Sequence, residues 1–253
     1  MGKVLAITNQ KGGVGKTTTA VNLGACLAVL GKKVLVLDND PQGNATSGLG
    51  LKKGEIKKCI YDVLISEIPI QDVITATQIT NLSAVPATIR LAGAEAELVG
   101  MMARDQRLRR SIEPVRNNYD FILIDCPPSL GNLTLNALAA ADAVVVPIQC
   151  EYYALEGLSQ LMKTLQLVQK NSNPSLSIQG VVLTMYDNRT NLSQQVAEEV
   201  KSYFQERVYE SIIPRNIRLS EAPSHGLPIN LYDEKSKGAE AYLDLAKEVI
   251  AGE

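Results

Sequence analysis

Residues 9–19 read NQKGGVGKTTT, a glycine-rich loop that ends in a lysine and adjacent hydroxyl side chains. Glycines in such a loop allow backbone N–H groups to close around phosphate oxygens, and the N-terminus of a following helix adds its dipole. Lys16 can reach the β- and γ-phosphates of a nucleoside triphosphate, and the hydroxyl of Thr17 can bind Mg²⁺. The residues predicted to form this phosphate site are Gly12, Gly13, Val14, Gly15, Lys16 and Thr17.

The loop departs from the standard phosphate-binding pattern in one place. The pattern G-x-x-x-x-G-K-[ST] has a glycine where this chain has Gln10, and Lys11 follows as a second positive charge inside the loop. Farther along the chain, Asp125 ends the apolar run FILID, where a carboxylate can hold Mg²⁺ through water. Asp38 ends the run VLVLD, Asp40 follows two residues later, and both could lie near the same ion.

Elements that could position these residues are visible in the alternation of short β-branched runs with helix-period segments. This alternation is typical of a doubly wound, mostly parallel α/β sheet with helices on both faces. Ligands bind such sheets at the carboxyl ends of the strands. We expect one domain over residues 1–253. The predicted strands are 3–8, 33–38, 81–87, 120–125, 143–148, 178–184 and 208–214, and the main predicted helices are 16–30, 152–170, 191–206 and 237–250.

The composition is that of a globular protein, with 45% hydrophobic and 21% charged residues. The net charge of −2 means that any binding of nucleic acid has to come from a local basic patch. The four cysteines are widely spaced, which suits reduced thiols, and no run reaches the ~18 apolar residues of a membrane span. A cytoplasmic location is therefore expected.

The phosphate loop resembles the deviant Walker A motif, K-G-G-x-G-K-[ST], of the ParA/MinD superfamily of ATPases. Other segments resemble its chromosomal ParA/Soj branch, and the resemblance extends over nearly the whole chain. It implies a deviant Walker A P-loop NTPase fold and slow, partner-stimulated hydrolysis of ATP with Mg²⁺. The segments are VLDNDPQGNATSGLG (36–50), DFILIDCPPSLG (120–131), PIQCEYYALEGLSQL (147–161) and IIPRNIRLSEAPSHG (212–226).

The resemblance also implies roles for individual residues. Lys11 would reach across a homodimer interface to the phosphates of the other subunit, so that dimerisation depends on ATP. Asp40 would orient or activate the attacking water, and Asp38 would support the Mg²⁺ shell together with Asp125. Lys11, Lys16 and Asp40 are therefore the catalytic candidates. Further nucleotide contacts implied by the family are Thr18 at the α-phosphate and Pro214 and Asn216 beside the adenine.

ParA proteins bind DNA without sequence preference as ATP-bound dimers, and Arg189 and Arg218 match the DNA-binding positions. The resemblance thus implies a nucleoid-associated switch for chromosome or plasmid segregation, with a ParB/Spo0J-like partner that stimulates hydrolysis. A further run, RDQRLRRSIEPVR (104–116), carries five arginines. We interpret it as a solvated helix face, with a secondary DNA surface as the alternative.

Two other branches of the superfamily remain as alternatives. A MinD-like ATPase ends in a basic amphipathic helix that binds membranes, whereas the last segment here carries Glu240, Asp244, Glu248 and Glu253, which anionic lipid would repel. We therefore expect no membrane binding and expect the apolar stripe of this segment to pack inside the protein. An iron–sulfur carrier would need cysteines arranged at a dimer interface.

Two asparagines depart from the family pattern. Asn39 lies between the two aspartates, and Asn132 lies in SLGNLTLNAL, where relatives usually have apolar or small residues. A buried amide without partners would cost ~1–3 kcal/mol. These positions put details of the hydrolysis site in doubt and leave the prediction of nucleotide binding unchanged.

Overall fold

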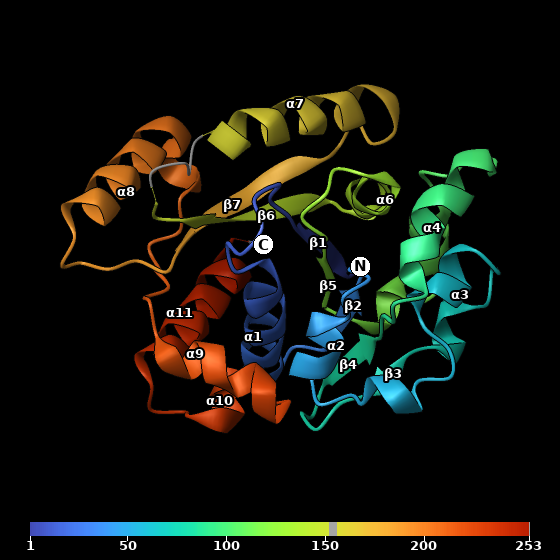
Figure 1. The fold of residues 1–253 in the computed structure, drawn as a ribbon, viewed down its shortest axis with the longest axis horizontal. Helices are drawn as coiled ribbons and strands as arrows, with labels where there is room; N and C mark the ends of the chain where they lie inside the picture. Colours follow the sequence, from blue (N-terminus) through green and yellow to red (C-terminus); the bar gives the residue numbers. More distant parts are fainter. Residues whose placement is uncertain (152–155, 253) are drawn as a thin grey trace.

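The computed structural model describes residues 1–151 and 156–252, which form a seven-stranded sheet between two layers of helices (Figure 1). The strand order is β3-β4-β2-β5-β1-β6-β7, and all neighbours are parallel except β3 and β4. This confirms the predicted fold class. The strands are β1 (Lys3–Ile7), β2 (Val34–Asp38), β3 (Thr75–Ala76), β4 (Leu82–Val85), β5 (Phe121–Asp125), β6 (Ala143–Gln149) and β7 (Ser177–Thr184).

Alternate residues of the central strands pack on opposite faces, as the two-residue period of a strand requires. In β1, Leu5 and Ile7 belong to one apolar cluster, and Val4 and Ala6 belong to the other. The first cluster is covered by α1 (Lys16–Val29), α2 (Asn44–Gly48), α9 (Ile217–Glu221), α10 (Ile229–Tyr232) and α11 (Lys237–Ala251). The second is covered by α3 (Ile60–Leu64), α4 (Leu91–Glu97), α5 (Arg107–Ile112), α6 (Asn132–Ala140), α7 (Glu156–Asn171) and α8 (Asn191–Phe204). Short 3-10 turns occur at Lys53–Glu55, Ile70–Asp72, Leu98–Gly100, Arg116–Asn118, Gln205–Arg207 and Ala222–His225.

The predicted strand at 208–214 is wrong. Within the described residues, only its two ends form isolated bridges, one to β7 and one to the loop after it. The backbone N–H groups of Glu210 and Ser211 instead donate to the carboxylate of Glu248 on α11, each at 2.8 Å. The N–H groups of Tyr209 and Ile213 still donate to β7, so the pairing with the sheet edge is interrupted between these two residues. The short edge strand β3, in turn, was not predicted.

The predicted helices agree with the structure more closely than the predicted strand at 208–214 does. The predicted helix 152–170 corresponds to α7, and its residues 152–155 lie outside the described part of the chain. The helix predicted at 191–206 ends at Phe204 and continues as a 3-10 turn. Gly31 follows α1 with φ +86°, a left-handed conformation that favours glycine at a helix end.

The apolar stripe of α11 packs inside the protein, as predicted. Tyr242, Leu245, Ala246 and Val249 are almost completely buried in the cluster that contains α1. Figure 1 shows α11 lying beside α1 on the same face of the sheet. No helix in the described part of the chain combines the length and the apolar content that a membrane span needs.

Candidate functional site

The glycine-rich loop connects β1 to α1 at the carboxyl edge of the sheet. Gly13 and Gly15 have φ angles of +76° and +89°, which a residue with a Cβ adopts only with strain. Gly15 is the N-cap of α1, and no side chain caps this end in the described structure. Because the first turn also contains no acidic residue, its N–H groups and the helix dipole are available to an anion.

Lys16 lies over this loop and is largely buried. Its Nζ donates a hydrogen bond to the backbone oxygen of Lys11 at 2.9 Å. Burial lowers the pKa of Lys16, and the negative charges of Asp125 and Asp40 partly oppose that shift. A phosphate in the loop would stabilise the charged ammonium further, which is the role predicted for this residue.

Lys11 has a different position. It is not among the residues that line the cavity over the loop, and its side chain is 30% exposed. The ammonium forms an ion pair with Glu151 at 3.6 Å, and Glu151 forms a second one with Arg215, also at 3.6 Å. The predicted trans-acting lysine is thus held by a carboxylate of its own chain.

Asp125 is the group of the site whose charged form is most destabilised by burial. It is completely buried, and neither carboxylate oxygen makes a hydrogen bond of normal geometry within the described residues. Burial raises the pKa of Asp125 well above its usual value, the nearby Asp38 raises it further, and the Thr17 hydroxyl partly lowers it. An unpaired buried carboxylate beside a hydroxyl is a donor set that a hydrated Mg²⁺ ion fits.

Asp38 is buried next to Asp125 in the paired strands β2 and β5, but its oxygens are occupied. One oxygen accepts bonds from the N–H and the hydroxyl of Thr46, both at 2.7 Å, and the other accepts the N–H of Asp40 at 3.2 Å. Burial raises the pKa of Asp38 to about 6, and these bonds counteract part of the shift. In this structure, Asp38 therefore anchors the segment between β2 and α2.

Asp40 lines the cavity over the phosphate loop, which has a volume of about 330 Å³. One carboxylate oxygen of Asp40 accepts the backbone N–H of Gln42 at 2.8 Å. The structure therefore brings the predicted water-activating carboxylate to the same cavity as Lys16 and Thr17. Its role in hydrolysis remains a prediction.

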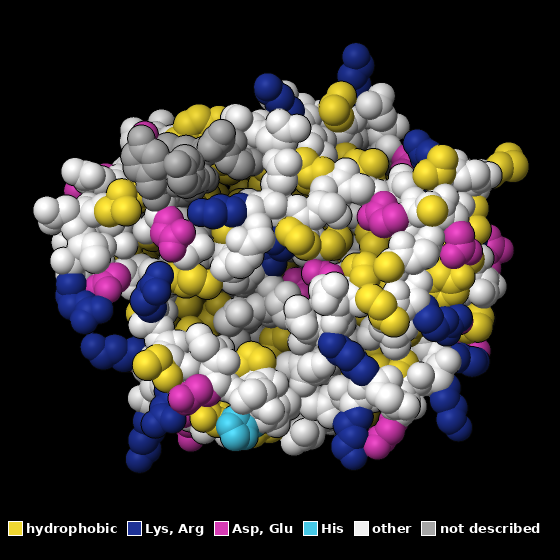
Figure 2. All heavy atoms as spheres, viewed as in Figure 1, with side chains coloured by type: hydrophobic (Ala, Val, Ile, Leu, Met, Phe, Trp, Pro, Cys, Tyr) yellow, Lys and Arg dark blue, Asp and Glu magenta, His cyan; other side chains and the backbone are white. Residues whose placement is uncertain are grey.

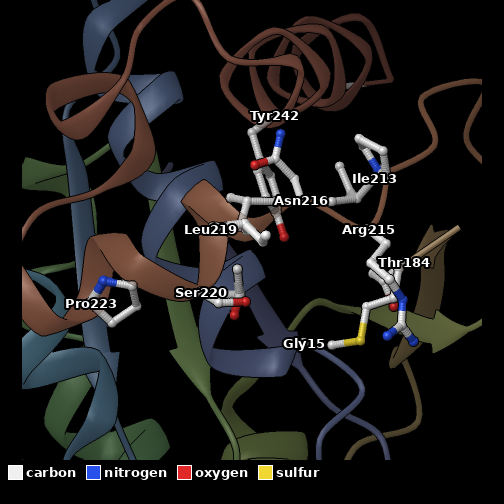
Figure 3. Close-up of a pocket in the computed structure, with 13 residues that line it drawn as sticks. Gly15, Thr184, Ile213, Arg215, Asn216, Leu219, Ser220, Pro223 and Tyr242 are labelled. Atoms are coloured by element: carbon white, nitrogen blue, oxygen red, sulfur yellow. The ribbon is translucent and has the colours of Figure 1, made fainter.

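A second cavity, of about 480 Å³, adjoins the first and shares Gly15, Thr18 and Met185 with it (Figure 3). Its volume is in the range of small-molecule sites. The predicted adenine residues Pro214 and Asn216 both line it. Sequence reasoning assigned no role to several other wall residues. Ile213 and Leu219 lie in the family-like segment 212–226, whereas Thr184 and Met185 at the end of β7 and Tyr242 on α11 belong to no motif.

The two unusual asparagines differ in their surroundings. The side chain of Asn132 donates to the backbone oxygen of Glu95 at 2.9 Å, and the Asn132 backbone N–H donates to the Glu95 carboxylate at 2.7 Å. The side chain of Asn39 donates to the backbone oxygen of Leu133 at 2.9 Å, while its Oδ1 has no partner among the described residues. The expected free-energy cost of an unpaired buried amide therefore applies only to the Oδ1 of Asn39.

Both arginines predicted to bind DNA are exposed and paired with acidic side chains. Arg189 makes two hydrogen bonds to Asp187, at 2.8 and 2.7 Å, and its side chain is 83% exposed. Arg218 contacts Glu221 at 3.0 Å and Asp233 at 3.4 Å. Figure 2 shows basic and acidic side chains interspersed on the side of the molecule that carries α8 and α9. This side therefore has no uniformly basic patch in that view.

The arginine run at 104–116 is a solvated face only in part. Arg104, Arg109 and Arg110 are exposed, whereas Arg107 and Arg116 are largely covered and bind backbone oxygens. Arg107 donates to the backbone oxygen of Leu64. Arg116 donates to the backbone oxygen of Gly2 at 2.8 Å and pairs with Asp142 at 2.6 Å. Such bonds tie helix ends and strand ends together, which solvated arginines would not do.

Comparisons with known proteins give a consistent result. Residues 2–178 match the family model described as "AAA domain". The chain is 65% identical to the sporulation initiation inhibitor protein Soj of Bacillus subtilis, over 99% of both chains, and 54% identical to the chromosome partitioning protein ParA of Caulobacter vibrioides, over 99% of this chain and 95% of the relative.

Solved structures with the same fold include two that are at least 29% identical in sequence. Cobyrinic acid a,c-diamide synthase from Mycobacterium smegmatis, with a bound ATP analog and magnesium, is 38% identical with a TM-score of 0.87, over 99% of this chain and 95% of that chain. The cell division ATPase MinD of Pyrococcus furiosus is 29% identical with a TM-score of 0.81, over 99% of both chains.

Proposed function

The chain belongs to the ParA/Soj family of chromosome-partitioning ATPases, and from this premise we propose that it is an ATP-dependent dimerising switch that binds DNA without sequence preference and releases it on hydrolysis. The observation that carries the proposal is the pair of loop lysines. Lys16 covers its own phosphate cavity, whereas Lys11 belongs to the same loop but does not line that cavity. A cation so placed would act on the nucleotide of a second subunit by leaving its ion pair with Glu151.

The nucleotide would be MgATP, bound across the two adjoining cavities. Lys16 and the N–H groups of the loop would hold the phosphates, with Thr18 beside the α-phosphate. The base would lie near Pro214 and Asn216. Thr17 and Asp125 would hold Mg²⁺, Asp125 through water and Asp38 only indirectly, and the ion when bound would neutralise charge on the phosphates. Asp40 would orient the attacking water, since it lines the same cavity as Lys16.

Dimerisation is tested by sedimentation of the wild type and of Lys11→Ala with ATP, with ADP and without nucleotide. We expect the wild type to dimerise only with ATP, and the variant to bind ATP but remain monomeric. Lys52→Ala, which removes another exposed lysine, is the matched control. A Lys11→Ala protein that still dimerises with ATP would refute the trans-acting role.

DNA binding is tested on a duplex of unrelated sequence at several salt concentrations. Because phosphate contacts release counterions, affinity should fall steeply with salt and should not depend on sequence. We expect binding with ATP alone and expect it to weaken in Arg189→Ala and Arg218→Ala. Arg110→Ala, on the exposed side of α5, is the control. Binding that is independent of nucleotide would count against a switch.

The family also supports a ParB/Spo0J-like activator and a place on the nucleoid in the cytoplasm. An ATPase rate that stays flat when such a partner and DNA are added would remove the activator from the proposal. The MinD-like alternative predicts sedimentation with anionic liposomes, and the buried stripe of α11 argues against it. The iron–sulfur alternative predicts a coloured protein, and all four cysteines are buried.

A further inference from the structure

Three ion pairs involve the loop that carries the predicted DNA-binding Arg189, the neighbouring Arg215 and the phosphate loop. Arg189 pairs with Asp187, Arg215 pairs with Glu151, and Glu151 also pairs with Lys11. The pKa of Asp187 is lowered to about 2, chiefly by Arg189 and in smaller part by Arg215. The charge of Arg215 therefore also acts on Asp187, although its guanidinium pairs with Glu151.

Arg215 is placed among these ion pairs by the backbone. Its N–H donates to the backbone oxygen of Tyr186 at 3.0 Å, which holds the segment around Pro214 against the loop that follows β7. Arg189 belongs to that same loop. Arg215 lies at the wall of the larger cavity (Figure 3), but its side chain is 62% exposed and its guanidinium pairs with Glu151.

A guanidinium binds a phosphate with the same two-pronged geometry with which it binds a carboxylate. Asp187 takes two hydrogen bonds from Arg189 and thus occupies the position that two oxygens of a phosphate would take. Glu151 meets Arg215 through a single ion-pair contact of 3.6 Å, without the two hydrogen bonds that Asp187 accepts. The paired carboxylates are therefore competitors of any phosphate that approaches these arginines.

We propose that Arg215 is a third DNA-phosphate contact on the surface that carries Arg189, and that Asp187 and Glu151 limit DNA affinity by competing with phosphate for these arginines. The inference rests on the proposed DNA binding and extends it to a residue outside the arginines that the family resemblance supplies. It also assigns a function to the acidic partners.

The experiment measures DNA affinity at saturating ATP for preparations that sedimentation has shown to be dimeric. We expect Arg215→Gln to weaken binding by about tenfold, since a charge-assisted contact is lost. The slope of log affinity against log salt concentration should become shallower by about one for each arginine removed. Arg215→Lys should retain part of the affinity because it keeps the charge, and Arg110→Gln is the control.

Asp187→Asn is the decisive variant, because the proposal predicts that this substitution increases DNA affinity. Asparagine keeps the oxygen that accepts the backbone N–H of Arg189, so the loop should keep its shape. Loss of an exposed ion pair that competes with phosphate should raise DNA affinity by about fivefold. General damage to the fold would lower affinity instead, so an increase cannot be explained by misfolding.

The outcomes separate this inference from the proposed function. Unchanged affinity in Arg215→Gln together with lost affinity in Arg189→Ala would overturn the inference and leave the proposed function intact. Weaker binding of a fluorescent ATP analogue by Arg215→Gln, with no effect on DNA, would also overturn it by assigning the residue to the nucleotide. No DNA binding by the wild type under any condition would refute the proposed function itself.

Discussion

Replacement of Asp125 by asparagine should stabilise the nucleotide-free protein while weakening its response to Mg²⁺ and ATP. Asp125 is completely buried and neither of its oxygens is paired within the described residues. The effective cost of an unpaired buried charge is several kcal/mol. An asparagine of the same shape is neutral, and an unsatisfied amide costs only ~1–3 kcal/mol. We therefore expect a gain of about 2 kcal/mol in the free energy of unfolding.

The gain should depend on pH in a definite direction. Because the pKa of Asp125 is raised in the folded protein, the native state holds this proton more tightly than the unfolded state. The stability of the wild type then falls as pH rises from about 4, the value for an unfolded aspartate, towards the pKa of the folded protein. Asp125→Asn lacks this dependence. Its advantage should be small in acid and largest at neutral pH and above.

Thermal unfolding with and without MgATP measures both effects. A gain of about 2 kcal/mol corresponds to roughly 4–8 °C in Tm for a domain of this size. The wild type should gain stability on addition of MgATP by linkage, and the variant should gain less. Asp38→Asn is the matched control, since its carboxylate already accepts bonds from Thr46 and should not yield the same gain. An apo variant less stable than the wild type would refute the reasoning.

Three further predictions concern the fold alone, and chemical denaturation measures each of them. Asp62→Ala should lose about 1–3 kcal/mol, since the carboxylate accepts a backbone N–H at the start of α3 and two bonds from a guanidinium. Burial would raise its pKa, but these bonds lower it overall, so the loss should shrink as pH falls below about 4. Gly24→Ala should cost about 1–3 kcal/mol because its Cβ would lie 2.8 Å from a β2 side chain, whereas Gly31→Ala, in open space at φ +86°, should cost about 1 kcal/mol. Arg107→Ala should destabilise by at least 1 kcal/mol through its bonds to the end of α3, and the exposed Arg109→Ala should stay within about 0.5 kcal/mol.

The parts of the fold that were predictable are those whose signal is local. Six strands are short apolar runs, and the central ones are buried on both faces, so their pattern is visible without knowledge of their neighbours. The segment 208–214 has the same β-branched character, but the carboxylate of Glu248 on α11 takes up the backbone N–H groups of Glu210 and Ser211. The strand β3 has two exposed residues and therefore carries no apolar signal.

The candidate site likewise has one part that the sequence predicts and another part that only the tertiary fold reveals. Its phosphate half is one continuous loop followed by a helix, so the residue types and their spacing were sufficient to predict it. The walls of the larger cavity come from segments more than fifty residues apart in the chain, among them Thr184 and Tyr242, and no motif links them. Pairings such as that of Lys11 with Glu151 also depend on the tertiary fold. The sequence indicates which groups are charged, and only the fold determines which charges meet.

The pairing of Lys11 with Glu151 bears on how ATP could control dimerisation. The two groups are 3.6 Å apart with side chains 30% and 45% exposed, and an exposed pair of this kind contributes about 0–1 kcal/mol. A triphosphate carries several negative charges and would be closed off from water between two subunits, where Coulomb attraction is stronger. Glu151 is therefore too weak a competitor to hold Lys11 back once a second subunit presents its nucleotide. If dimerisation depends on ATP, the dependence must come mainly from the charge of the phosphates and only in small part from release of this ion pair.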